Sequence, residues 1–377
     1  MTSPDLSASL RSELDAKQDR LLALMADHGW TAVLLSRHEN LAWVTAGRVE
    51  ARVGLGSETA VCSLLITRTG KRHYIAPNNE AARLADEEFA GLGFEPALYP
   101  WTDGDAATDL AHKLGGPETA SDTAPAGLPS GFYPLNLTPL RTPLLSTEIE
   151  RFRTLGAAVA ASTSRILKTL APGVTEDEMA ARVAADLFAQ HITPTVLLMA
   201  TDERILRYKH AVPRAGVLKN YGMLNLCARR WGMVVSITRF VHFGAMPAAL
   251  AANFERAARI NAALLHASRA GASSAQLYAV AAQGYADAGF PDEINQHHQG
   301  GPCGYQERDW VATPDGAERI AAAQGLAWNP SLQGAKAEDT AVLNDGEIEV
   351  ITATPELPVI ETTIDGNVYP SAGVYLP

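Results

Sequence analysis

The residues best suited to chemistry lie in one glycine-rich stretch, INQHHQGGPCGYQER, which spans residues 294–308. It places His297 and His298 side by side and ends on the neighbouring Glu307 and Arg308. A neutral imidazole can bind a metal ion, and its ordinary pKa of about 6.5 also suits proton transfer at neutral pH. The stretch therefore indicates one wall of a site, either for a metal or for an organic substrate.

The spacing of possible ligands gives a metal little support. A catalytic zinc ion usually takes about three protein ligands, and hard divalent ions prefer several carboxylates. Adjacent residues of an extended chain point to opposite sides, so we expect His297 and His298 not to bind one ion together. No His-x-x-x-His or Cys-x-x-Cys spacing occurs. His210 and His242 are further candidates, although a single histidine is more often a packed or solvated residue.

The sequence gives equally little indication of a catalytic nucleophile or a phosphate-binding site. The sequence has no Gly-x-Ser-x-Gly elbow, and GGPCG lacks the lysine of a phosphate-binding loop. Cys303 follows Pro302, where a small side chain that fits beside glycines is the simpler interpretation.

Length and composition favour a two-domain globular protein. The chain has 377 residues, 47% of them hydrophobic, and a formal charge of −11 without a basic stripe, which argues against a nucleic-acid partner. Three widely spaced cysteines do not suggest disulfides, and no apolar run reaches the length of a membrane span. The charged N-terminus lacks the apolar core of a signal peptide. We expect a cytoplasmic protein with no membrane association.

The elements that must position these residues fall into two groups. Residues 1–143 alternate helix and strand signals, which predicts a small α/β domain. Its helices are expected at 14–29, 79–89 and 106–116, its strands at 31–36, 58–67 and 72–76, and a Pro- and Gly-rich boundary at 117–143.

Residues 144–377 predict a larger α+β domain with helices outside a β-sheet. Capping boxes at Thr147-x-x-Glu150, Thr175-x-x-Glu178 and Ser273-x-x-Gln276 predict three helix starts. Strand-like runs are expected at 196–200, 222–228, 232–243, 325–332, 341–344, 347–353 and 366–370, and a further helix at 250–270.

From about residue 146 to 352 the order of motifs resembles the creatinase, prolidase and aminopeptidase P family. The helix start LLSTEIERFRTLGAAVAA is followed by the His-containing turn KHAVP and the strand pair GMLNLCARRWGMVVSITRF. HHQGGPCGY, GLAWNPSL and AKAEDTAVL then occur in the family's order. The resemblance implies a pita-bread catalytic domain preceded by a smaller creatinase-type α/β domain.

Metal-dependent members of that family hold two divalent ions with two Asp, one His and two Glu. Carried over by position, the resemblance places four of these ligands on Asn225, Ser236, Gly301 and Asn329, and only Glu338 survives. A shift of three residues in the glycine-rich stretch would place the His on His298 instead of Gly301, which restores one ligand of the four. A single carboxylate would leave the charge of two divalent ions uncompensated, and neutral Asn and Ser oxygens are poor substitutes. We therefore expect no bound metal and no other cofactor.

Creatinase works without metal in this family and uses a histidine as acid and base. The resemblance of KHAVP to that turn implies the catalytic role for His210. It further implies that His297, His298, Glu338 and Arg308 contact the substrate. Arg48, in the first domain, resembles an arginine that reaches the partner subunit's pocket, which implies a homodimer.

Three functions follow from this resemblance. The first is a metal-independent hydrolase of a small amide, amidine or dipeptide-like substrate, with His210 as the acid–base group. The second is a pseudoenzyme that keeps the pocket and serves as a binding protein. The third is a metallo-aminopeptidase or prolidase with unusual ligands.

Overall fold

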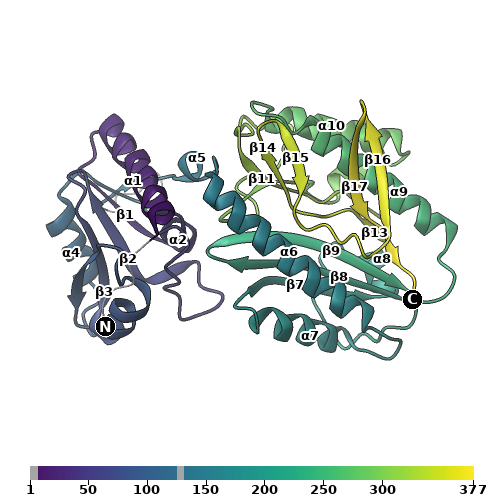
Figure 1. The fold of residues 1–377 in the computed structure, drawn as a ribbon, viewed down its shortest axis with the longest axis horizontal. Helices are drawn as coiled ribbons and strands as arrows, with labels where there is room; N and C mark the ends of the chain where they lie inside the picture. The colour runs from purple at the N-terminus through teal and green to yellow at the C-terminus, as the bar shows by residue number, and fades with distance from the viewer. Residues whose placement is uncertain (1–6, 125–130) are drawn as a thin grey trace. The chain divides into compact units, whose positions relative to one another are not determined.

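The computed structural model describes residues 7–124 and 131–377, so part of the boundary expected at 117–143 lies outside the described residues. The chain divides into two compact units, Met1–Arg141 and Thr142–Pro377. Figure 1 shows a single sheet flanked by helices in the first unit and a larger assembly of strands and helices in the second.

The first unit contains a mixed six-stranded sheet in the order β4-β3-β2-β1-β5-β6. β1 pairs antiparallel with β2 and β2 with β3, whereas the β1–β5, β5–β6 and β3–β4 pairs are parallel. The strands are β1 (Ala32–Arg37), β2 (Thr59–Thr67), β3 (Arg72–Pro77), β4 (Glu95–Tyr99), β5 (Thr119–Ser121) and β6 (Tyr133–Pro134). The expected α/β character of this region is confirmed.

The helices of the first unit are α1 (Ala8–His28), α2 (His38–Val44), α3 (Ala81–Arg83), α4 (Ala106–Gly115) and α5 (Thr138–Arg141). α1 starts earlier than predicted because the Ser7 hydroxyl accepts a hydrogen bond from the Leu10 N–H, and it ends at Gly29 with φ of 75°. The single helix predicted at 79–89 is wrong in detail. It is a 3₁₀ turn (Asn78–Glu80), then α3, then a π-helical turn (Leu84–Glu88).

The second unit is built on two four-stranded sheets, ordered β18-β9-β8-β7 and β10-β11-β14-β15. The first contains β7 (Thr193–Thr201), β8 (Tyr221–Arg230), β9 (Met233–His242) and β18 (Val374–Tyr375). The second contains β10 (Gly300–Cys303), β11 (Gln324–Trp328), β14 (Ala341–Asn344) and β15 (Glu347–Val350). Two further antiparallel pairs are β12 (Ser331–Leu332) with β13 (Ala335–Lys336) and β16 (Val359–Ile364) with β17 (Asn367–Ala372).

Helices pack outside these sheets, as predicted for the larger domain. α6 (Ser146–Lys168) and α7 (Glu176–Phe188) contact the β7–β9 sheet, and α9 (Ala248–Ala267) contacts β11, β16 and β17 (Figure 1). α10 (Ser274–Asp287) packs on α9, and both bury apolar side chains against Leu326 and Trp328. The short elements α8 (Glu203–Arg207) and η3 (Pro291–Asn295) precede the two histidine segments.

The helix starts in the second unit follow the sequence in two cases out of three. The capping boxes at Thr175 and Ser273 are present, whereas the predicted box at Thr147 and Glu150 is wrong. Glu148 takes the role instead, since its carboxylate accepts from the Leu145 N–H at 2.8 Å. Glu148 is also buried and accepts a hydrogen bond from Tyr305, and the capping box of α6 lies two residues earlier than predicted.

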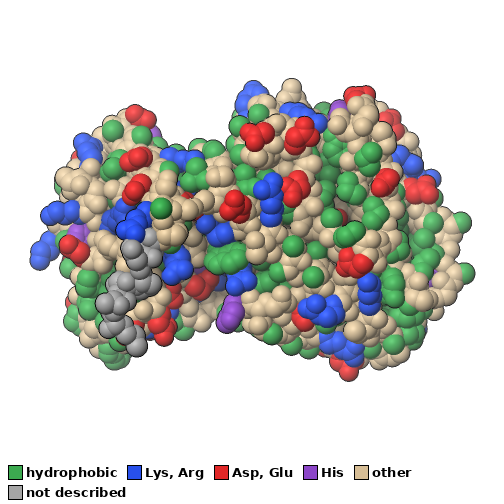
Figure 2. Space-filling view, in the orientation of Figure 1, with side chains coloured by type: hydrophobic (Ala, Val, Ile, Leu, Met, Phe, Trp, Pro, Cys, Tyr) green, Lys and Arg blue, Asp and Glu red, His purple; other side chains and the backbone are tan. Residues whose placement is uncertain are grey.

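Acidic and basic side chains are interspersed over the visible face of each unit, without a large patch of one sign (Figure 2). Within residues 7–124 and 131–377, no helix combines the length and apolarity that a membrane crossing requires.

Candidate functional site

The β8–β9 hairpin places side by side two positions that the resemblance assigns to metal ligands. Asn225 on β8 lies opposite Thr238 on β9, and Cys227 lies opposite Ser236. Because alternate residues of a strand share a face, these four side chains point to the same side of the sheet. Glu338 approaches them from the segment between β13 and β14, where its carbonyl accepts from the Thr238 N–H at 3.1 Å.

The Glu338 carboxylate is buried and bonded on both oxygens. Its Oε1 lies 3.1 Å from Arg308 Nη2, and its Oε2 lies 2.8 Å from Lys336 Nζ. Oε2 also accepts from Asn225 Nδ2 at 2.5 Å and from the Thr238 hydroxyl at 2.6 Å. These five residues are the floor cluster. Burial alone would raise the pKa of Glu338, but Lys336 and Arg308 lower it to about 2.

Arg308, which the resemblance implies contacts the substrate, points inward to Ser236 and Glu338. Its Nη1 donates to the Ser236 hydroxyl at 3.0 Å, and its side chain is only 11% exposed. Lys336 and Thr238 were not singled out from the sequence. Lys336 could have been found, because a residue two positions before Glu338 on an extended segment projects to the same side.

The other two positions that the resemblance assigns to metal ligands are Gly301, where a larger side chain does not fit, and the neutral Asn329. Gly301 lies in β10, where an added Cβ would collide with the backbone oxygen of Trp310, so no larger side chain fits there without a backbone shift. Asn329 follows β11 and is 2% exposed, and its Oδ1 has no hydrogen-bond partner. Asn329 is held in place through its N–H, which donates to the Gln299 carbonyl.

Three histidines from two segments gather beside the floor cluster. His210 follows α8, and His297 and His298 follow η3. An ion pair joins the segments, since Lys209 Nζ lies 2.7 Å from the Glu293 carboxylate. Gln299 fixes the turn after His297, because its amide donates to the His297 carbonyl.

The three imidazoles, here called the rim histidines, are close enough to act together. His210 Nε2 and His297 Nε2 are 3.0 Å apart, and the rings of His297 and His298 stack with centroids 4.3 Å apart. The expectation that His297 and His298 point to opposite sides is wrong, because the chain bends at His297 instead of running extended. Within the described residues, the rim histidines place one ligand atom each within 4.8 Å of the others.

Comparison with known proteins identifies the family. A model of metallopeptidase family M24 matches residues 150–349, more than half of the chain. The chain belongs to metallopeptidase family M24. A curated relative, the probable dipeptidase PepE of Mycobacterium tuberculosis (strain ATCC 25618 / H37Rv), is 26% identical, covering 90% of this chain and 94% of the relative.

Solved structures of M24-like peptidases share the fold. The dipeptidase PepE from Mycobacterium ulcerans superposes with a TM-score of 0.73 at 19% identity, covering 91% of this chain and 96% of that chain. The prolidase from Pyrococcus horikoshii OT3 gives a TM-score of 0.74 at 15% identity, covering 90% and 98%. The predicted family and the pita-bread fold with its preceding α/β domain are therefore confirmed.

The floor cluster does not fit the pair of divalent ions that the resemblance to metal-dependent members of the family implies. Its one carboxylate is already neutralised by two side-chain cations, Arg308 and Lys336. Asn225 and Ser236 are neutral and are already hydrogen-bonded to Glu338 and Arg308, and a ligand side chain at Gly301 would need a backbone shift. Adding ions here would place several positive charges in a buried, already compensated site, which is strongly unfavourable.

The rim histidines are held in their neutral form. Burial followed by Lys336 lowers the pKa of His297 to about 3, and burial followed by Arg308 lowers that of His298 to about 4. The pKa of His210 is lowered by partial burial of its ring and then by Lys336. At neutral pH this M24 site therefore offers imidazole lone pairs next to a fixed pair of cations.

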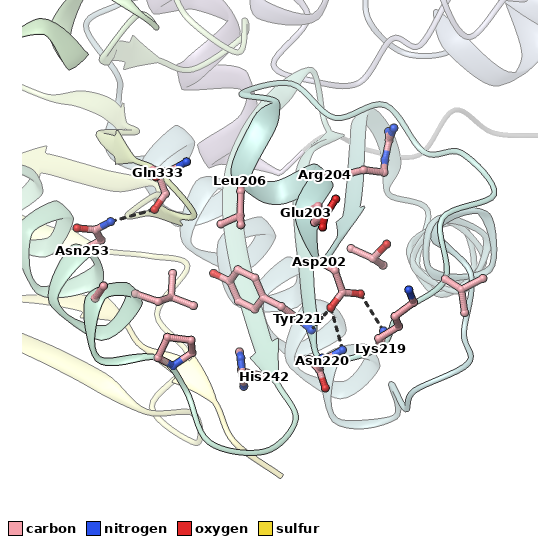
Figure 3. A pocket seen from close by; sticks show the side chains of 15 residues that line it. Asp202, Glu203, Arg204, Leu206, Lys219, Asn220, Tyr221, His242, Asn253 and Gln333 are labelled. Atoms are coloured by element: carbon pink, nitrogen blue, oxygen red, sulfur yellow. Dashed lines mark hydrogen bonds between the residues drawn. The ribbon is translucent and has the colours of Figure 1, made fainter.

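Two cavities border this region. A small one of about 30 Å³ lies between His297 and Lys336, enough for a single water molecule. A second, of about 900 Å³, lies farther along the same strands. Figure 3 shows Tyr221, His242 and Leu206 around it, with the Asp202 carboxylate bonded to the backbone N–H groups of residues 219–221.

Two residues singled out in the sequence are members of neither cluster. Arg48 is exposed after α2 in the first unit, and its role toward a partner subunit stays a prediction, as does the homodimer. Cys303 is fully enclosed in β10, where burial raises its thiol pKa far above the ordinary value, which fits a packing role.

Proposed function

We propose that this M24 protein hydrolyses a C–N bond of a small amide, amidine or dipeptide-like substrate, with His210 as acid and base and without the two-metal centre. The carrying observation is the ion-paired floor cluster beside the rim histidines. Arg308 and Lys336 contact Glu338 where a metal-dependent site would need carboxylates and ions. A peptidase substrate class is supported by the family and by the dipeptidase relatives.

His210 is placed to transfer a proton in this reaction. Its lowered pKa keeps Nε2 available as a base at neutral pH, and His297 Nε2 at 3.0 Å can share its proton. For an amide, His210 takes a proton from water as the water oxygen attacks the carbonyl carbon. The C–N bond then breaks, and the same proton passes from His210 to the leaving nitrogen.

The cations of the floor cluster supply the electrostatic part of the mechanism. Negative charge develops on the carbonyl oxygen as water attacks, and fixed positive groups in a site with little water stabilise it. Lys336 borders the small cavity next to His297, which is large enough for the attacking water. His298 and Glu338 complete the polar lining toward the substrate, while Arg308 acts mainly by holding Glu338.

A binding protein without catalysis is the second candidate, and the saturation of the floor cluster favours it. Glu338 already receives bonds from four side chains, and Ser236 receives one from Arg308. Groups that are fully bonded to each other stabilise a fold without needing a substrate. Only turnover separates the two candidates.

The test is hydrolysis of a dipeptide panel, including X-Pro dipeptides, by untagged protein freed of metal with a chelator. We expect turnover that the chelator does not reduce. His210→Ala should lose about 100-fold or more in kcat, the usual contribution of a general base, and added imidazole should restore part of it. Because the pKa of His210 is lowered, the acid limb of kcat/KM should lie below about pH 6.5.

His191→Asn is the matched control. His191 is an exposed histidine after α7 with φ of 58°, a conformation that asparagine tolerates, so this variant should keep full activity. Unchanged turnover in His210→Ala would contradict the acid–base assignment. Turnover that requires added metal would restore the metallopeptidase hypothesis, and no turnover on the whole panel would favour the binding protein.

A further inference from the structure

We propose that the rim histidines His210, His297 and His298 form a binding site for one divalent transition-metal ion. This site is separate from the family's two-metal position, which the floor cluster occupies. It does not rest on the proposed hydrolysis, because the binding of an ion can be measured without a substrate. The sequence spacing does not indicate this site. His210 comes from a segment far from the other two, and His297 and His298 are adjacent.

The geometry suits a single ion. Zinc–nitrogen bonds are about 2.05 Å long, so two nitrogens 3.0 Å apart subtend an angle of roughly 95° at the ion. Two such bonds span at most about 4.1 Å. All three ligand atoms already lie within 4.8 Å of one another, so small rotations of the partly exposed rings bring them into range.

The protonation state also suits an ion. A metal binds the neutral imidazole, and protons compete for the same lone pair. The lowered pKa of all three rim histidines removes this competition at neutral pH. The Nε2 atoms of His210 and His297 share a hydrogen bond, so one of them carries a hydrogen. That hydrogen must move to another ring nitrogen or be released before both atoms can bind the ion.

The ligand set selects the class of ion. Three imidazoles suit Zn²⁺, Co²⁺, Ni²⁺ and Cu²⁺, whereas Mg²⁺, Ca²⁺ and Mn²⁺ prefer oxygen ligands. Lys336 and Arg308 oppose any cation, but both are paired with Glu338, which offsets part of their charge. Because the nearby cations still repel the ion in part, we expect weaker binding than in a closed structural zinc site. Water would fill the open coordination position.

An ion at this site would act on the proposed chemistry. It would take the Nε2 lone pair of His210, so the base would be lost while the ion stays bound. The site therefore gives the protein a route to inhibition by Zn²⁺ or its neighbours, with no effect expected from Mg²⁺.

The experiment is titration of untagged, metal-free protein with Co²⁺, followed by visible absorption, because the d–d bands report nitrogen coordination directly. We expect saturation at one ion per chain and displacement by Zn²⁺ but not by Mg²⁺. His297→Ala and His298→Ala should each weaken binding by more than about tenfold, since losing even an outer-shell partner of a ligand costs that much.

Two controls locate the ion. His266→Ala removes a partly exposed histidine that is hydrogen-bonded to Tyr369, and it should leave the titration unchanged. Ser236→Ala alters a former metal position without removing a rim ligand and should also bind normally. Loss of binding in Ser236→Ala, undiminished binding in both rim variants, or no saturable Co²⁺ spectrum would each overturn the proposal.

Discussion

Glu338 in the floor cluster is buried and bonded on both carboxylate oxygens, whereas His210 at the rim is exposed and bonded mainly to another histidine. The two regions adjoin, since the charges of Lys336 and Glu338 act on His210. They differ in what a ligand would have to displace. On the floor it would have to break charged hydrogen bonds, and at the rim it would meet neutral rings.

The floor cluster and the rim histidines therefore differ in how much they contribute to the stability of the fold. Charges that are paired inside a protein are costly to uncover, so the floor cluster resists both substitution and occupation by ions. Partly exposed polar groups contribute little to stability and remain available to a ligand. We therefore expect substitutions on the floor to lower stability as well as turnover, and those at the rim to act on binding and turnover with little loss of stability.

The largest expected effect comes from Glu338→Gln. The substitution leaves Arg308 and Lys336 as buried cations without a counter-charge, so the free energy of unfolding should fall by about 3–5 kcal/mol. Chemical denaturation measures the loss. His298→Ala is the rim comparison and should change stability by less than about 0.5 kcal/mol.

A double-mutant cycle sharpens this result. Lys336→Met in the Glu338→Gln background removes one of the uncompensated cations, so the double variant should be more stable than the sum of the single losses predicts. Additive losses, or a loss below about 1 kcal/mol for Glu338→Gln, would mean that the floor cluster is not held by its charges.

The next effect is a loss of stability in acid. The folded-state pKa of Glu338, about 2, lies below its unfolded value of about 4.5, so its contribution is present above pH 4.5 and is lost as pH falls toward 2. The difference corresponds to roughly 3 kcal/mol. Unfolding measured from pH 6 to pH 2 should show this component in the native protein and not in Glu338→Gln. Parallel curves for the two proteins would contradict the assignment.

A smaller effect is expected at Gly301, where the family places its histidine. The Cβ of Gly301→Ala meets the Trp310 backbone oxygen, so we expect a loss of about 1–3 kcal/mol from forced backbone movement. Gly346→Ala is unsuitable as a control because its φ is positive, whereas Gly104→Ala meets no atom within 4 Å. Equal thermal stability of Gly301→Ala and Gly104→Ala would show that a ligand side chain could return to this position.

The sequence predicted the strands of the site well because buried strands carry strong apolar runs. The strands expected at 222–228 and 232–243 became β8 and β9, and their register brings Asn225 and Ser236 to one face. The motif order also identified Glu338, whose pairing follows from local alternation with Lys336.

Other features depend on contacts that no local pattern encodes. The ion pair of Lys209 with Glu293 joins segments far apart in the chain, and it brings His210 to His297. The stacking of His297 on His298 depends on a bend that the extended-chain rule does not foresee. The inward turn of Arg308 likewise depends on its ion pair with Glu338, which lies far along the chain.

The most direct test of the account is an anomalous diffraction experiment on crystals grown with Co²⁺, measured at the cobalt edge. The account predicts that Arg308 and Lys336 remain paired with Glu338 and that no peak lies beside that carboxylate. A single peak among His210, His297 and His298 is the position expected for an ion. Two peaks next to Glu338, with Arg308 displaced, would contradict the central claim that side-chain cations have replaced the metal pair.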